Sequence, residues 1–100
     1  MTPARRLVLS PRAVADLEEI AAFIARDNPV RARSFVDDLE CKCRAAAAHP
    51  ELYPLRDDLG PGVRMVTHGR YLVLYRDLIT ENLVRIERVV HGARDSRRML

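Results

Sequence analysis

The 100-residue sequence contains no Trp, and its only aromatic residues are three Tyr and two Phe. A folded core must therefore consist mainly of Leu, Val, Ile and Ala. No run of about 18 consecutive apolar residues occurs, which argues against a transmembrane helix. The apolar run after Arg5 and Arg6 is too short for the core of a secretory signal. We therefore expect a cytoplasmic protein without a membrane partner.

Glycine, proline and cysteine are also scarce, with four, six and two residues respectively. Nearly half of the sequence is apolar, so the chain should fold, and its length predicts a single domain over residues 1–100. Cys41 and Cys43 lie two positions apart in a predicted helix and point to different sides of it. That placement suits neither a disulfide nor a metal chelate, and we expect no metal and no cofactor.

Lysine is nearly absent, because 16 of the 17 basic residues are Arg and only Lys42 is Lys. Residues 63–100 hold eight Arg against four acidic residues, whereas residues 1–62 hold nine basic and ten acidic ones. The positive excess is thus confined to the C-terminal part. A basic surface of this kind attracts nucleic acid or an acidic protein partner.

Two helix starts follow the same pattern, a capping residue and then proline, at Ser10-Pro11 and at Asn28-Pro29. The first helix should end at Asp27-Asn28 and the second at His49-Pro50. Apolar residues recur at helical spacing in both segments: Val14, Leu17, Ile20 or Ala21, and Ile24 in the first, then Ala32, Phe35 or Val36, Leu39, Cys43, and Ala46 or Ala47 in the second. The two helices should form a hairpin whose apolar faces cover a sheet.

Four segments are predicted as strands: 5–9, 63–67, 70–76 and 83–90, with a loop over residues 51–62. Within the third, Leu72 and Leu74 share one face, while Tyr71, Val73 and Tyr75 share the other. Within the fourth, parity places Arg88 on the face of Val84, Ile86 and Val90. Arg88 must then reach the sheet edge, either with its head in solvent or paired with a carboxylate.

The resulting order is β-α-α-β-β-β. We expect an α+β fold in which the helical hairpin packs on one face of a mostly antiparallel four-stranded sheet and leaves the other face free.

This arrangement resembles the RelE/ParE superfamily of toxins from type II toxin–antitoxin systems. The resemblance covers nearly the whole chain and depends on a co-linear set of segments: Ala15-Asp16-Leu17-Glu18-Glu19-Ile20, Phe23-Ile24-Ala25, Asn28-Pro29, Ala32, Phe35, Pro50, Gly62-Val63-Arg64, Gly69 to Arg76, and Ile86 to Asp95. It implies a toxin that a cognate antitoxin neutralises by wrapping a disordered segment around it, as a helix or as a strand. The ParE branch is similar to inhibitors of DNA gyrase, and the RelE branch to endonucleases that cut mRNA on the ribosome.

Cleavage of RNA without a metal needs a base, cations at the scissile phosphate and an acid. If the chain is a nuclease, the candidates are His91, Arg88, Arg64 and Arg85. His91 alone could act as acid or base near neutral pH, although a structural histidine at the strand end is the alternative. His68 and His49 are expected in solvent.

The sequence departs from the RelE pattern, which implies a Lys cluster and a C-terminal Tyr. No Tyr lies beyond Tyr75, and Lys42 is in the second helix. We therefore favour the ParE branch, a toxin that acts by binding gyrase. The expected target or antitoxin contacts, which lie in and after the predicted sheet, are Arg64, Arg70, Tyr71, Tyr75, Arg76, Arg88, His91 and Arg94.

Two alternatives remain open at this stage. Tyr71 and Tyr75 either lie on an open sheet face, where they would contact a base or an antitoxin, or cap the edge of the core. The chain could also be a nucleic-acid-binding regulator, although it contains no helix-turn-helix pattern.

Overall fold

The computed structural model of the chain describes residues 5–93. Its elements are β1 (Arg6–Leu9), α1 (Pro11–Ala25), α2 (Pro29–Ala48), the 3-10 turn η1 (Pro50–Leu52), β2 (Val63–His68), β3 (Tyr71–Leu78), the 3-10 turn η2 (Ile79–Glu81) and β4 (Leu83–His91). The predicted order β-α-α-β-β-β is confirmed, with strand boundaries within two residues of the expected ones.

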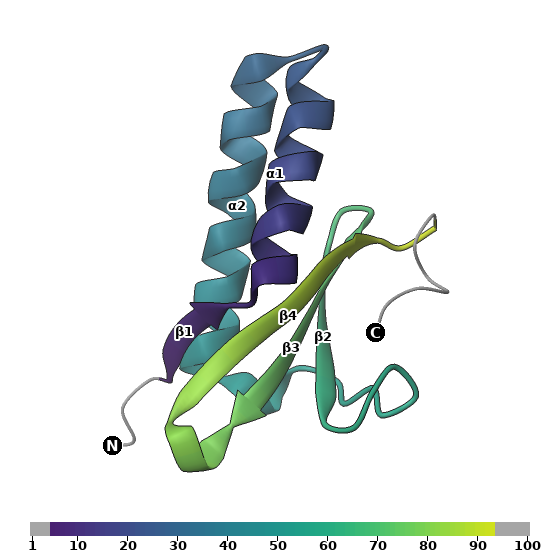
Figure 1. Cartoon of the computed structure of the whole chain (residues 1–100). Helices are drawn as coiled ribbons and strands as arrows, with labels where there is room; N and C mark the ends of the chain where they lie inside the picture. The colour runs from purple at the N-terminus through teal and green to yellow at the C-terminus, as the bar shows by residue number, and fades with distance from the viewer. Residues whose placement is uncertain (1–4, 94–100) are drawn as a thin grey trace.

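The four strands form one sheet in the order β1-β4-β3-β2. β1 pairs with β4 in parallel, whereas β4 with β3 and β3 with β2 pair antiparallel. The α1–α2 hairpin lies against one face of this sheet, and its closed end projects beyond the strands (Figure 1). The predicted α+β class and mostly antiparallel sheet are confirmed.

Both helix starts have the predicted caps. The Ser10 hydroxyl accepts a hydrogen bond from the Ala13 N–H at 3.0 Å, and the Asn28 side chain accepts one from the Arg31 N–H, also at 3.0 Å. α1 ends at Ala25, earlier than expected, because Asn28 must leave helical geometry to cap α2, and its φ is −153°. A tight turn over residues 26–28 therefore separates the helices.

The main core lies between the helices and the sheet. The α2 contribution follows the predicted stripe, with Phe35, Leu39 and Cys43 buried. In α1 the buried residues are Ala13 and Ile20, whereas Val14 is 42% exposed and was wrongly expected in the stripe. The strands contribute six buried residues to this core: Val66, Val73, Tyr75, Val84, Ile86 and Val89.

β4 contains a bulge that changes which residues share a face. Leu74 pairs with Arg88 and Tyr75 with Ile86, so Glu87 is an extra residue without a partner in β3. Val84 and Ile86 therefore face the helices, while Arg88 and Val90 belong to the opposite face. The parity expectation for Arg88 is wrong, because strict alternation does not continue across an inserted residue.

The opposite face of the sheet has a small apolar cluster of its own. Val63, Leu74 and Val90 are buried there, and Leu59, Met65 and Leu72 pack against them. Leu59 comes from the loop over residues 53–62, which folds back along β2 through a hydrogen bond from the Arg56 N–H to the Val63 carbonyl at 2.6 Å. The expectation of a free second face is thus wrong where this loop reaches it.

Tyr75 joins the sheet to the end of the second helix. Its side chain is fully buried on the helix-covered face, and its hydroxyl donates a hydrogen bond to the Pro50 carbonyl at 2.7 Å. Tyr53 contacts its ring edge-on. Tyr75 therefore caps the core and does not lie on an open face.

We predict that Tyr75→Phe lowers the free energy of unfolding by about 1–2 kcal/mol, because a buried carbonyl loses its donor. Equilibrium denaturation in urea measures this change. Tyr71→Phe is the matched control, since the Tyr71 hydroxyl makes no hydrogen bond within residues 5–93. Equal effects of the two changes would contradict the prediction.

The two cysteines differ in exposure, since Cys41 is exposed and Cys43 is buried. Burial raises the pKa of the Cys43 thiol from 9.0 to about 11. The folded state holds this proton more tightly than the unfolded state. The protonated Cys43 thiol therefore contributes its full share to the free energy of unfolding below pH 9, and this contribution is lost as the pH rises towards 11.

We predict that the free energy of unfolding falls between these pH values by about 2 kcal/mol more in the wild type than in Cys43→Ala. Denaturant unfolding at several pH values tests this. If the free energy of unfolding changes with pH to the same extent in the wild type and in Cys43→Ala, the prediction is wrong.

Candidate functional site

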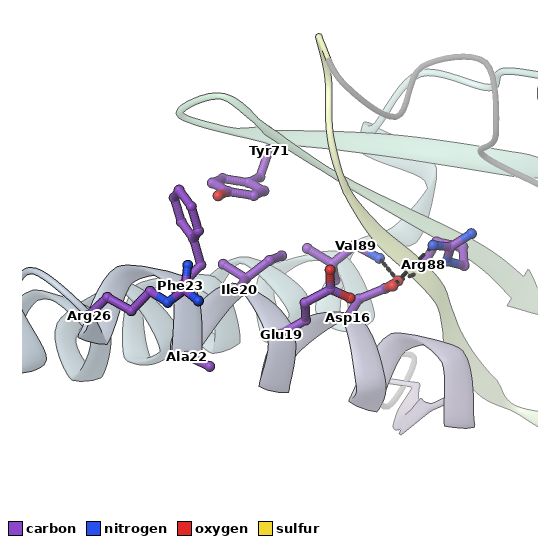
Figure 2. A pocket seen from close by; sticks show the side chains of 9 residues that line it. All are labelled: Asp16, Glu19, Ile20, Ala22, Phe23, Arg26, Tyr71, Arg88 and Val89. Carbon is purple, nitrogen blue, oxygen red and sulfur yellow. Dashed lines mark hydrogen bonds and ion pairs between the residues drawn. The ribbon is translucent and has the colours of Figure 1, made fainter.

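A groove of about 410 Å³ lies between α1 and the second half of β4. Its lining comes from one side of α1, from β4 and from the start of β3 (Figure 2): Asp16, Glu19, Ile20, Ala22, Phe23, Arg26, Tyr71, Arg88 and Val89. We call this feature the α1–β4 groove. Its floor is apolar and its rim is charged, which is the composition of a recognition site.

One end of the groove is closed by an ion pair. The Arg88 guanidinium donates two hydrogen bonds to the Asp16 carboxylate, at 2.8 and 3.0 Å. The same carboxylate accepts the Val89 N–H at 2.9 Å. Both charged side chains are about 15% exposed. Of the two environments considered for Arg88, the carboxylate partner is confirmed and the solvated head, the interpretation that the sequence favoured, is wrong.

The outer edge of β4 is occupied along most of its length. β1 pairs with it from Leu83 to Ile86. The Ser10 N–H and hydroxyl then donate to the carbonyls of Ile86 and Glu87, at 2.9 and 2.8 Å. Asp16 takes the next outward N–H, that of Val89. An edge whose donors and acceptors are already paired is a poor template for a further strand.

Glu19 and Phe23 lie along the groove side of α1, and Arg26 follows directly after its last residue (Figure 2). Phe23 is 54% exposed although it is a large apolar side chain. Tyr71 from β3 and the buried Ile20 line the groove next to it (Figure 2). The groove therefore combines an aromatic side chain with charged residues of both signs.

A second set of charges lies on the sheet face opposite the helices. Arg76 and Arg85 are cross-strand partners, and such like charges repel each other. Glu87, placed by the bulge, pairs with both of them. Arg85 donates a hydrogen bond to the Glu87 carboxylate. That bond is the main reason why the pKa of Arg85 is raised. The carboxylate therefore partly neutralises the pair.

The structure separates the other sequence-predicted residues. Arg64 points to the loop and donates to the Tyr53 carbonyl at 2.7 Å, and Arg70 is exposed in the β2–β3 turn. His91 contacts the Tyr71 ring edge-on, with centroids 5.3 Å apart. Arg94 lies outside the described residues. Of the expected contacts within residues 5–93, only Tyr71 and Arg88 line the α1–β4 groove.

Both histidines expected in solvent can be located. His49 is exposed, but His68 is half-buried with its ring 5.3 Å from that of Phe35. His68 belongs to β2 and not to the turn, so that expectation is wrong for His68.

Sequence reasoning missed the contribution of α1 to the site. Asp16 and Glu19 fall off the apolar stripe of the helix, so the helical periodicity gives them no role. The available signal was Phe23, an aromatic residue at the spacing i+4 from Glu19 and i+7 from Asp16. That pattern indicates that the side of the first helix with Asp16, Glu19 and Phe23 does not serve only to cover the core.

A family model for the ParE toxin of the type II toxin–antitoxin system parDE matches residues 7–96. The chain belongs to this family. It is also 32% identical over 96 residues to Toxin ParE1 of two Mycobacterium tuberculosis strains, with 95% of this chain and 97% of the relative covered. This ParE-family protein is therefore a toxin of a type II toxin–antitoxin system.

Solved structures show the same fold. A chain of the chromosomal ParDE system from P. aeruginosa matches with a TM-score of 0.75 at 21% identity, covering 88% of this toxin and 96% of that chain. A chain of the toxin–antitoxin complex RelBE2 from Mycobacterium tuberculosis matches with a TM-score of 0.64 at 24% identity, covering 91% and 94%. None of the toxin's helices within residues 5–93 is long and apolar enough to cross a membrane.

We predict a strong energetic coupling between Asp16 and Arg88. Asp16→Ala should lower the free energy of unfolding by about 2–3 kcal/mol, because it leaves a largely buried cation and the Val89 N–H without their acceptor. In a double-mutant cycle with Arg88→Ala, the coupling energy should reach about 1–2 kcal/mol.

The pair Glu40 and Arg44 is the control for this cycle. Both side chains are more than half exposed on α2, so their coupling should stay below about 0.5 kcal/mol. Similar coupling energies for the two pairs would show that Asp16 does not fix α1 to β4.

Proposed function

We propose that this toxin acts in the cytoplasm by binding and inhibiting DNA gyrase, and that a cognate antitoxin neutralises it. The observation that carries the proposal is the state of the arginines. Arg88 is held by Asp16, Arg76 and Arg85 share Glu87, and Arg64 is bound to a backbone carbonyl.

A metal-free ribonuclease needs cations directed at the scissile phosphate and a general base or acid beside them. Here a phosphate would have to compete with Asp16 for Arg88 and with Glu87 for Arg85. His91 packs against Tyr71 on the face that carries the helices, whereas Arg85 belongs to the opposite face. These positions favour inhibition by binding over cleavage of mRNA, which is the alternative function.

The family and the structural neighbours support an antitoxin partner. The neighbours' titles name a ParDE system and a toxin–antitoxin complex. The toxin has a formal net charge of +3, so an acidic, partly disordered antitoxin encoded in the adjacent reading frame would complement it. Among residues 5–93, no group of three His, Cys, Asp or Glu is placed to hold a metal ion.

We predict that the purified toxin inhibits supercoiling of relaxed plasmid by gyrase and leaves mRNA intact in a translating extract. Addition of the antitoxin should restore supercoiling. Cleavage of mRNA that is lost in His91→Ala or in Arg88→Gln would instead establish the nuclease function.

A further inference from the structure

We infer that the closed end of the α1–α2 hairpin docks into an acidic cleft of the enzyme that the toxin inhibits, with Val30 and Arg33 among its main contacts. We call residues 23–33 the hairpin tip. The inference depends on the proposed inhibition of gyrase, and it adds the surface of the toxin that binds this enzyme.

The hairpin tip is a convex element with a fixed shape. Its closed end projects beyond the strands (Figure 1). The Ile24 carbonyl accepts the N–H groups of Asp27 and Asn28 at 3.2 and 2.9 Å, and the Asn28 side chain caps α2. An element that is ordered before binding loses little conformational entropy in a complex. Disordered segments bind in grooves or along strand edges, so a convex end is better suited to the cleft of a folded partner.

Two pairs of side chains flank the turn with the same spacing. Phe23 and Arg26 lie three positions apart where α1 ends, and Val30 and Arg33 lie three positions apart where α2 begins. Residues at this spacing share a side of a helix. Phe23 and Val30 are 54% and 80% exposed. Each side of the turn therefore presents an exposed apolar residue beside a cation.

The positive charge of the hairpin is concentrated at its tip. Residues 23–33 hold three Arg and one Asp. Residues 11–22 hold one Arg and three acidic residues, and residues 34–48 hold two basic and three acidic ones. A partner that receives the tip is therefore attracted to it if the partner's cleft is acidic, and the acidic remainder of the hairpin disfavours contact further along the helices.

The arginines of the tip also differ from those of the sheet in their partners. Arg26 and Arg33 are exposed, and within residues 5–93 neither guanidinium makes an ion pair or a hydrogen bond. Arg85 and Arg88 are already bound to carboxylates. A partner's carboxylates can therefore bind the tip without competing with an acid of the toxin. The exposed side chain of Val30 favours a protein surface over the phosphates of DNA.

Binding of purified gyrase to toxin variants tests the surface. Val30→Ser and Arg33→Glu should each weaken binding, and raise the toxin concentration that half-inhibits supercoiling, at least about tenfold. Ile79→Ser and Lys42→Glu are the matched controls, because they change an exposed apolar residue and an exposed cation outside the tip. They should alter binding less than about twofold. Urea unfolding of each variant checks that its fold is retained.

The antitoxin is the second ligand for the same variants. Val30 and Arg33 lie outside the α1–β4 groove, and we expect the affinity for the antitoxin to change less than about twofold. Equal losses of affinity for gyrase and for the antitoxin would overturn the inference. Unchanged inhibition by Val30→Ser and Arg33→Glu, or equal losses in the two controls, would overturn it while leaving the proposed function intact. Failure of the wild-type toxin to bind gyrase would refute the proposed function, and the inference with it.

Discussion

The attachment of α1 to the outer edge of β4 is the interaction on which the remaining structure depends. Ser10 caps the helix and bonds to β4 with its N–H and its hydroxyl. Asp16, about two turns further on, bonds to the next outward N–H of β4 and to Arg88. The two residues fix the direction of α1 relative to the sheet, and α2 follows through the hairpin (Figure 1). The α1–β4 groove exists because this attachment stops at Val89 while α1 continues.

The bulge at Glu87 has consequences on both faces of the sheet. Before it, Val84 and Ile86 enter the core, and after it Val89 does. Val90 instead belongs to the small apolar cluster on the opposite face of the sheet. The inserted residue also places a carboxylate between Arg76 and Arg85, which are opposite each other on neighbouring strands. One irregular residue thus keeps β4 apolar towards the helices and makes a pair of like charges tolerable.

Arginine supplies 16 of the 17 basic residues of this toxin. The arginines of β2, β3 and β4 bind to Asp16, to Glu87 and to a loop carbonyl. Such pairs stabilise the surface and define its shape, and they lower the charge that a phosphate would encounter. Phe23, a large apolar side chain beside them, is 54% exposed. Recognition of a protein partner needs this combination of shape, apolar area and a few oriented charges.

The sequence alone determined the order of the elements and much of the core, because those features depend on local signals. Ser10-Pro11 and Asn28-Pro29 start helices through their own side chains, and the α2 stripe follows from helical periodicity. Only the tertiary structure decided which face each strand residue occupies and where the site lies. The bulge at Glu87 changes the alternation because it arises from pairing between strands, which local periodicity does not register. Tyr75 is buried, and Asp16 meets Arg88 across 72 positions of sequence, because long-range packing brings α1 beside β4. The groove is a property of that contact, and no single segment of the sequence contains it.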